Sequence, residues 1–368
     1  MMVGTVKKPV RVLIVDDSAM IRKVLSIGFE ADPMLEVVGA ASDGRKALQM
    51  VQELRPDVIT LDIEMPHIDG VGFLKRLMPD RPIPTVVISS VTSEGANVTL
   101  QALEAGAVDV IAKPALGVGQ GLTRIMAEIC TRVRAAAHAK PVIGKLAGRR
   151  LTLPRNRPSA PDHVILIGAS TGGVQALSSL LPMMPADAPP IVIVQHMPEG
   201  FTAQFAKRLN ASCHIAVREA EDGDLLQAGT ALIAPGGKRH LVLRGRKPVL
   251  RVALEEGPPV CFSTPSVDML FRSAVRILGT HCAAALLTGM GKDGAEGLLE
   301  IRRAGGRTIA QDEASSVVWG MPGHAAQIGA ADQILPLNYI SAALLDPPEV
   351  RLLKLTTRKD PVDDVTRC

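Results

Sequence analysis

Aromatic residues are scarce in this 368-residue chain, since Phe, Trp and Tyr together make up only 2% of it. The cores must therefore be built from Val, Ile, Leu and Ala, and few rings are present on which nucleic-acid bases could stack. The formal net charge of +4 is also small for a chain of this length. We therefore expect no nucleic-acid partner.

Cysteine is equally sparse and is not arranged in pairs. The five cysteines are odd in number, widely spaced and without a C-x-x-C pattern, which argues against a disulfide framework and a zinc site. They are Cys130, Cys213, Cys261, Cys282 and Cys368. No H-E-x-x-H motif or His/Cys cluster is present either, so metal-dependent hydrolysis is not expected.

Long apolar runs are missing as well. Near the N-terminus only Val12–Val15 is continuously apolar, which is too short for a signal peptide. No later run approaches the roughly 20 apolar residues of a membrane span. We therefore expect a cytoplasmic protein without membrane insertion, and a chain of this length predicts two domains.

Short apolar runs alternate with helical spacing through residues 10–115. The runs are VRVLIVDD, LEVVGAA, DVITLD, TVVISS and DVIAKP. Strands that alternate with helices in this way predict a doubly wound, flavodoxin-like α/β domain with five parallel strands, over residues 1–137. Residues 138–162 combine four prolines with clustered basic residues, which indicates a linker.

A second α/β pattern covers residues 163–345 and predicts a Rossmann-like domain with a mostly parallel sheet. Its expected strands are VILIGAS, PIVIVQHM, TALIAPGG, HLVLRG, PVLRVAL, AAALLTGM and RTIAQD. HLVLRG and PVLRVAL flank a short turn, so they are expected to form a β-hairpin set into that sheet. Residues 346–368 show little periodicity and are expected to be a peripheral tail.

Acidic residues follow two strands of the first domain. Asp16 and Asp17 end the first strand and Asp62 ends the third, so their carboxylates should meet at one edge of the sheet. A hard cation such as Mg²⁺ would relieve their repulsion, and a carboxylate beside it can attack phosphorus. Ser89 and Lys113 at two further strand ends offer a hydroxyl and a positive charge. Alternatively, each Asp merely caps the helix that follows it.

The segments VDDSAMIRKVL, LDIEMPHIDG, VVISS and AKP resemble the receiver domain of bacterial response regulators over residues 10–130. The resemblance implies phosphorylation of this domain in the presence of Mg²⁺. It assigns Asp62 as phosphoacceptor, Asp16, Asp17 and Asp62 as Mg²⁺ ligands, Ser89 as switch hydroxyl and Lys113 as the partner of the phosphoryl group.

A serine stands in a glycine-rich turn of the second domain. In VILIGASTGGVQAL, Ser170 lies within a G-x-S-x-G pattern formed by Gly168 and Gly172. A strand, a tight turn and a helix would expose the hydroxyl and aim helix N–H groups at an oxyanion. The same loop is also compatible with phosphate binding, and other strand ends must decide between the two.

A serine nucleophile needs a base and a group that orients the base. PIVIVQHM places His196 at the next strand end, and LLTGMGKDGAEG places Asp293 in another strand-end loop. His324 lies beyond Asp293 and is a rival base, because it gives the Ser, Asp, His order of α/β-hydrolases. The other histidines are interpreted as surface or packing residues: His67, His138, His163, His214, His240 and His281.

Residues 163–345 are similar to the catalytic domain of chemotaxis protein-glutamate methylesterases. The matching segments are GASTGG, QHMPEGFTAQFAKRLN, APGG, PSVDMLFRSA, LTGMGKDGAEGL and GMPG. The resemblance assigns Ser170 as nucleophile, His196 as base and Asp293 as its orienting acid, with backbone at Thr171 or Met290 near the oxyanion. His324 falls where the family pattern is not catalytic.

This resemblance implies hydrolysis of glutamate methyl esters on methyl-accepting chemoreceptors, with release of methanol, and deamidation of receptor glutamines. It implies a chemotaxis histidine kinase as phosphoryl donor, and the unphosphorylated receiver is expected to cover the esterase site. A DNA-binding response regulator is the alternative, and it predicts a helix-turn-helix in place of the second domain. A non-catalytic scaffold with an esterase fold is a second alternative.

Overall fold

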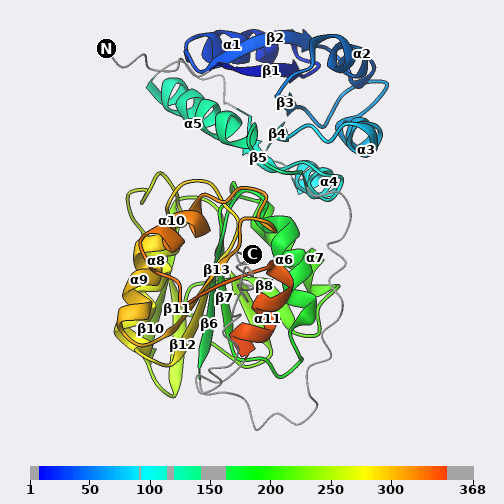
Figure 1. Ribbon diagram of the computed structural model, residues 1–368. Coiled ribbons are helices and arrows are strands. Elements are labelled where there is room, and N and C mark those ends of the chain that lie inside the picture. The colour runs from blue at the N-terminus through cyan, green and yellow to red at the C-terminus, as the bar shows by residue number, and fades with distance from the viewer. Residues whose placement is uncertain (1–7, 91–92, 114–119, 142–162, 346–368) are drawn as a thin grey trace, which may run out of the picture.

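The computed structural model describes residues 8–90, 93–113, 120–141 and 163–345. The first domain follows the predicted alternation of strands and helices (Figure 1). Its elements are β1 (Val10–Val15), α1 (Ala19–Glu30), β2 (Leu35–Ala41), α2 (Gly44–Leu54), β3 (Val58–Leu61), α3 (Gly70–Asp80), β4 (Thr85–Ser89), α4 (Ser93–Glu104), β5 (Asp109–Ala112) and α5 (Gln120–Ala136). Most of the predicted linker and the whole tail lie outside the described residues.

The five strands form one parallel sheet in the order β2-β1-β3-β4-β5, which confirms the doubly wound prediction. Strands β3 and β4 are buried throughout, as expected for strands covered by helices on both faces. Ser18, Asp43 and Asp69 accept backbone N–H groups at the starts of α1, α2 and α3.

The second domain contains a seven-stranded sheet in the order β14-β13-β12-β6-β7-β9-β8, in which every neighbouring pair is parallel. Its elements are β6 (Val164–Ala169), α6 (Gly173–Leu180), the 3₁₀ helix η1 (Leu181–Met183), β7 (Ile191–Gln195), α7 (Phe201–Asn210), β8 (Ala216–Glu219), β9 (Thr230–Ile233), β10 (Arg239–Arg246), β11 (Val249–Glu256), α8 (Val267–Leu278), β12 (Cys282–Leu286), α9 (Ala295–Arg303), β13 (Arg307–Gln311), α10 (Met321–Gln327), β14 (Gln333–Leu335) and α11 (Leu337–Leu345). The mostly parallel α/β fold is confirmed.

The predicted hairpin forms, but its position differs from the prediction. Strands β10 and β11 pair antiparallel from Arg239↔Glu256 to Arg246↔Val249 and make a separate two-stranded sheet. They do not join the parallel sheet, because β10 packs against helix α8 instead. The two outermost strands of the parallel sheet, β8 and β14, were not predicted.

Helices cover both faces of the second sheet (Figure 1). Alternate residues of β6 belong to two different cores: Ile165 and Ile167 pack with α6, α7 and α11, whereas Val164 and Leu166 pack with α8, α9 and α10. Because both faces are buried, the polar groups of this domain that can react gather at the strand ends.

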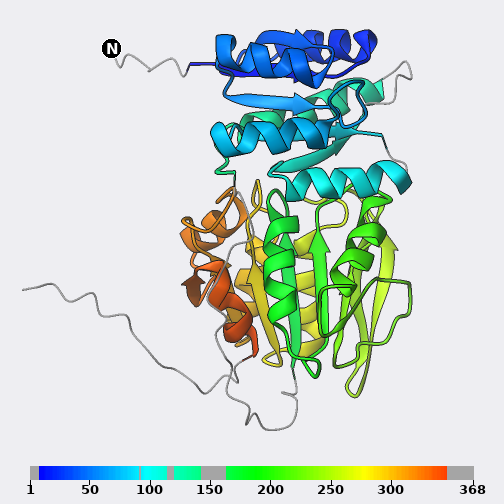
Figure 2. The ribbon, with the colours of Figure 1, turned by 90° about the vertical axis from the view of Figure 1, so that its right-hand side faces the viewer.

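The first domain is stacked on one end of the second sheet, as Figures 1 and 2 show, with helix α4 lying against α6 and α7. Residues of α4 and of α6 belong to one continuous apolar core. The end that is covered is the one where β6 and β13 finish, since Gly172 N–H donates there to the Val108 carbonyl of the first domain, and Lys140 N–H, just after that domain, donates to the Val317 carbonyl. None of the helices in the described ranges has both the length and the apolar composition needed to cross a membrane.

Candidate functional site

Ser170 directly follows strand β6, in a turn that leads into helix α6. Its N–H donates to the Thr288 carbonyl, and its own carbonyl accepts from Gly173 N–H at 2.7 Å. Gly172 has a φ of +80°, and a Cβ there would lie 2.5 Å from Val317 Cβ. A Cβ on Gly173 would lie 2.0 Å from Gln195 Oε1. The side chains of Val317 and Gln195 therefore leave little room for a Cβ at Gly172 and Gly173. The positive φ of Gly172 favours glycine as well.

His196 follows the neighbouring strand β7, and its N–H donates to the carbonyl of Ala169. This bond places the backbone of His196 beside the turn that carries Ser170. The ring Nε2 lies 2.9 Å from Asp293 Oδ2. The structure thus brings all three predicted triad residues to the carboxyl ends of β6, β7 and β12.

Asp293 is held in its ionised form by donors at the start of helix α8. Its carboxylate accepts the Ser266 hydroxyl at 2.7 Å, the Val267 N–H at 2.7 Å and the Asp268 N–H at 3.2 Å. Burial opposes its charge, but the hydrogen bond and charge of His196 and these donors lower the pKa of the carboxyl below its ordinary value. Because a carboxylate only accepts, Nε2 of His196 must carry a proton, which leaves Nδ1 as the basic nitrogen.

The Nδ1 atom of His196 lies 3.4 Å from the hydroxyl of Ser263. Within the described part of the chain, no hydrogen bond joins Ser170 Oγ to the imidazole. Catalytic hydrogen bonds are often long or misaligned before substrate binds, so this geometry is compatible with a triad that completes on binding.

A second strand-end loop presses against the nucleophile. A Cβ on Gly289 would lie 2.8 Å from Ser170 Cβ, so only glycine lets this backbone come so close. The next residue is Met290, one of the two predicted oxyanion positions. The other, Thr171, is buried directly after the nucleophile. Both predicted positions therefore lie on backbone that adjoins Ser170.

The rival base, His324, is not bonded to the other triad residues within the described ranges. It belongs to helix α10 and lines a groove of about 740 Å³ together with Gly291, Trp319, Gly320, Gly323, Ala326 and Gln327. In the hydrogen-bond network of residues 163–345, its ring is not bonded to Ser170 or Asp293. The geometry therefore favours His196 as the partner of Asp293.

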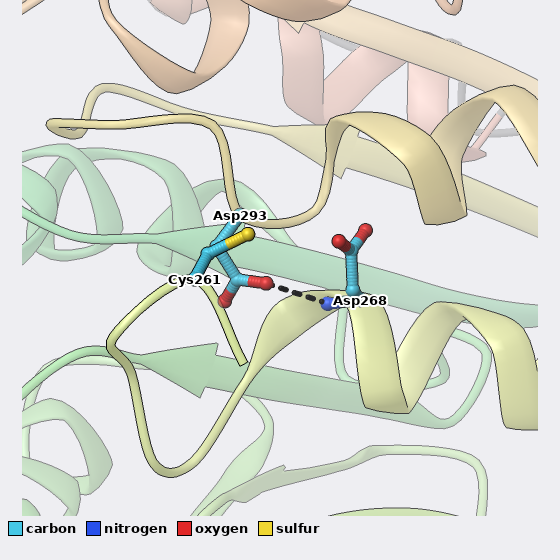
Figure 3. A group of neighbouring side chains, drawn as sticks. All are labelled: Cys261, Asp268 and Asp293. Carbon is cyan, nitrogen blue, oxygen red and sulfur yellow. Dashed lines mark hydrogen bonds between the residues drawn. The ribbon is translucent and has the colours of Figure 1, made fainter. Parts of the chain in front are cut away.

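Asp293 also belongs to a small cluster with Cys261 and Asp268, whose ligand atoms all lie within 4.8 Å of one another (Figure 3). The figure shows Asp293 turned toward the backbone nitrogen of Asp268, with the Cys261 thiol beside it. Both oxygens of Asp293 already accept hydrogen bonds from protein donors, and burial raises the pKa of the Cys261 thiol. This chemistry suits an orienting carboxylate and does not suit a metal site.

The predicted acidic cluster forms in the first domain. Oxygens of Asp16, Asp17 and Asp62 lie within 4.8 Å of one another, and Asp16 and Asp62 are buried. Lys113 Nζ lies 2.7 Å from Asp62 Oδ2 and 3.2 Å from Asp16 Oδ2. Ser89 ends the strand next to Lys113, whose N–H donates to the Ser89 carbonyl. All five predicted residues therefore meet at one edge of the sheet.

Three carboxylates here face one ammonium group, so negative charge is in excess. Burial raises the pKa of both Asp16 and Asp62. Asp16 Oδ2 is buried and receives no hydrogen bond from the described residues, although the Lys113 ammonium is near. A carboxylate set of this kind, with an oxygen left open, fits a hard cation such as Mg²⁺.

The first domain contacts the residues immediately after Ser170. Gly172 N–H donates to the Val108 carbonyl at 3.0 Å, and the Thr171 hydroxyl donates to Asp109 Oδ2 at 2.8 Å. Asp109 is in turn bound by the guanidinium of Arg132. One turn further along α6, Gln175 Nε2 donates to the carbonyls of Leu103 and Ala107, both at 2.8 Å. The nucleophile turn is thus tied directly to the first domain.

Several of these functional contacts were missed in the sequence. Ser266, which caps α8 and binds Asp293, had a signal, because Ser before an amphipathic helix is a common N-cap. No local sequence pattern indicated the contacts of Ser263, Asp109 and Gln175. His240, interpreted as a surface or packing residue, is buried, and its two ring nitrogens form hydrogen bonds to the Pro258 carbonyl and the Ser266 N–H that the sequence did not reveal.

Residues 165–344 match the CheB methylesterase family, and residues 12–124 match the response regulator receiver domain. A similar protein from Cereibacter sphaeroides is named "Protein-glutamate methylesterase/protein-glutamine glutaminase of group 2 operon". It is 54% identical over 342 residues, which cover 91% of each chain.

"Protein-glutamate methylesterase/protein-glutamine glutaminase 5" from Anaeromyxobacter dehalogenans is 50% identical over 354 residues, covering 93% of this chain and 98% of that protein. Among solved structures, the CheB methylesterase catalytic domain of Thermotoga maritima is 38% identical, with a TM-score of 0.48. The aligned region covers 50% of this chain and 97% of the Thermotoga domain.

Proposed function

We propose that this chain, which belongs to the family of receiver-bearing protein-glutamate methylesterases/protein-glutamine glutaminases, hydrolyses glutamate methyl esters on chemoreceptors. Phosphorylation of the receiver controls this activity. The observation that carries the proposal is the pairing of His196 Nε2 with Asp293, at the sheet edge where Ser170 also lies. Its place of action is the cytosol, where the receptor helices and a chemotaxis histidine kinase are found.

The reaction begins when the Ser170 hydroxyl oxygen attacks the ester carbonyl. His196 Nδ1 takes the serine proton, while Asp293 holds the ring and balances the imidazolium charge. The bond between the carbonyl carbon and the methoxy oxygen then breaks, and the leaving group takes that proton as methanol. Water next attacks the acyl-enzyme, with His196 as base, and restores the glutamate carboxylate and Ser170.

The oxyanion of each tetrahedral intermediate is bound by the backbone N–H groups of Thr171 and Met290. The close approach of Gly289 to Ser170 supports this assignment, because it brings the second donor next to the reacting atom. The same geometry serves glutamine deamidation, in which ammonia leaves in place of methanol.

The receiver, which we assign to residues 1–137, controls the esterase. We assign the linker to residues 138–162, the catalytic domain to 163–345 and the tail to 346–368. Asp62 takes the phosphoryl group as an acyl phosphate, with Ser89 and Lys113 beside it. Asp16, Asp17 and Asp62 would hold Mg²⁺, which supplies positive charge to the phosphoryl oxygens when bound.

The unphosphorylated receiver represses the esterase by covering its site. The hydrogen bonds from Thr171 to Asp109 and from Gly172 to Val108 support this, since they hold the receiver against the turn that carries Ser170. A receptor helix is about 10–12 Å wide with its side chains, so a domain docked on the residues next to Ser170 would obstruct its approach. Phosphorylation of Asp62 shifts the population from docked to undocked.

Replacing Gln175 by alanine is expected to raise the demethylation rate of the unphosphorylated chain about tenfold. Gln175 donates two hydrogen bonds to receiver carbonyls, and each is worth about 0.5–1.5 kcal/mol. A loss of about 1.4 kcal/mol in the docked state changes the undocked fraction tenfold. The measurement is methanol release without a phosphodonor. The matched control is Gln52→Ala on the exposed face of α2; an equal effect of both changes would contradict the docking role.

The esterase chemistry itself is tested by covalent labelling with a fluorophosphonate in the presence of a phosphodonor. We expect one label, on Ser170, that disappears in Ser170→Ala and persists in Ser178→Ala, whose serine is exposed on the neighbouring helix α6. A chain that takes no label would instead be a non-catalytic scaffold. The DNA-binding alternative is not supported, because residues 164–345 form a parallel α/β domain in place of a helix-turn-helix.

A further inference from the structure

A strained two-residue turn stands between strand β11 and helix α8. Val260 and Ser263 exchange two backbone hydrogen bonds, of 3.1 and 2.9 Å. The two central residues, Cys261 and Phe262, have φ values of +49° and +67°. Neither is the glycine or asparagine that such a turn favours, so the backbone is held in a costly conformation.

The turn separates its two central side chains. Cys261 is turned inward, with its thiol within 4.8 Å of the Asp293 carboxylate (Figure 3). Phe262 is 95% exposed, more than any other large apolar side chain in the described part of the chain. A single exposed apolar side chain is ordinary on a protein surface, so it is the place of this ring in the fold, more than its exposure, that indicates a role.

The segment that carries the turn is clamped at both ends by His240. Its buried ring accepts the Ser266 N–H at Nδ1, over 3.1 Å, so Nε2 must carry the proton and donate it to the Pro258 carbonyl. The Ser266 hydroxyl is bound to Asp293. The ends of the segment that carries Phe262 are therefore tied to the catalytic carboxylate.

The turn also lies at the rim of the catalytic site. Ser263, the residue after Phe262, has its hydroxyl 3.4 Å from His196 Nδ1, and Cys261, the residue before it, adjoins Asp293. A glutamyl ester side chain is short, so the helix that carries it must pass alongside the residues that border His196. Phe262 is the apolar group presented there.

We propose that Phe262 is a specificity-determining residue that packs between aliphatic side chains flanking the modified glutamate on the receptor helix. This proposal rests on the proposed function and adds how the enzyme recognises a macromolecular substrate. A small soluble ester would reach Ser170 without touching the ring. Phe262 should therefore affect receptor demethylation and leave small-ester hydrolysis unchanged.

The test compares two substrates with the full chain and a phosphodonor: methylated receptor in membranes, and the γ-methyl ester of N-acetylglutamate. For Phe262→Ala we expect kcat/KM on the receptor to fall about tenfold, mostly through KM, as for a contact residue at the centre of an interface. Hydrolysis of the small ester should stay at the wild-type rate. Phe262→Leu, which keeps apolar volume, should recover part of the loss.

Tyr339→Ala is the matched control, because it removes another exposed aromatic ring, from helix α11. It should leave both rates unchanged. An equal loss on both substrates for Phe262→Ala, or an undiminished rate on the receptor, would overturn the proposal. Failure of the wild-type chain to cleave either substrate would instead refute the proposed function itself.

Discussion

Replacing His196 by alanine is expected to lower kcat for methyl-ester hydrolysis by about 10⁴-fold, because it removes the base that activates Ser170. The expectation rests on the bond of Nε2 to Asp293, which leaves Nδ1 available as the base. KM should change little, since the imidazole acts on the reacting proton more than on the bound receptor.

The matched control is His324→Ala, which should retain nearly the wild-type rate. His324 stands on helix α10 and lines a groove with Trp319, and among the described residues its ring makes no hydrogen bond to Asp293. The measurement is the initial rate of methanol release from labelled receptors, with a phosphodonor present. Collapse of the His324 variant, together with near-normal activity of the His196 variant, would reverse the assignment of the base.

Replacing Asp62 by asparagine is expected to abolish incorporation of acid-stable, alkali-labile phosphate. Asparagine keeps the shape of the side chain but has no carboxylate to attack phosphorus. Chelation of Mg²⁺ should have the same effect on the wild-type chain, because the carboxylates of Asp16, Asp17 and Asp62 repel without a cation.

Burial raises the pKa of the Asp62 carboxyl in the metal-free site, whereas bound Mg²⁺ would favour the ionised carboxylate that attacks phosphorus. Asp57→Asn is the control, since Asp57 precedes β3 at the opposite end of the strand from Asp62. Undiminished incorporation in Asp62→Asn would exclude Asp62 as the acceptor.

Much of the fold could be predicted because its strands are buried on both faces. Strands such as β6, β7 and β12 are continuously apolar, and their ends are marked by glycine or polar residues. The edge strands β8 and β14 were missed because they are short and partly exposed, so their sequences lack this signal. The position of the hairpin depends on packing against α8, which no local pattern encodes.

The site divides in the same way. Ser170, His196 and Asp293 stand at strand ends, where topology brings side chains together whatever the intervening sequence. The hydrogen bonds that hold the surroundings of these three residues in place could not be predicted, because they join segments that are distant in the sequence. His240 clamping the loop before α8, and the Gln175 amide binding two receiver carbonyls, are of this kind. The left-handed backbone at Cys261 and Phe262 runs against local preference and could not be predicted either.

The measurement that tests the account most directly is methanol release from radiomethylated receptors, by the full chain with and without a small-molecule phosphodonor. We expect a low rate without the phosphodonor and a rate at least tenfold higher with it, a shift that needs only about 1.4 kcal/mol between docked and undocked states. Ser170→Ala should release no methanol in either condition, and Asp62→Asn should stay at the low rate in both. Equal rates with and without phosphodonor in the wild-type chain, or methanol release by Ser170→Ala, would contradict the account.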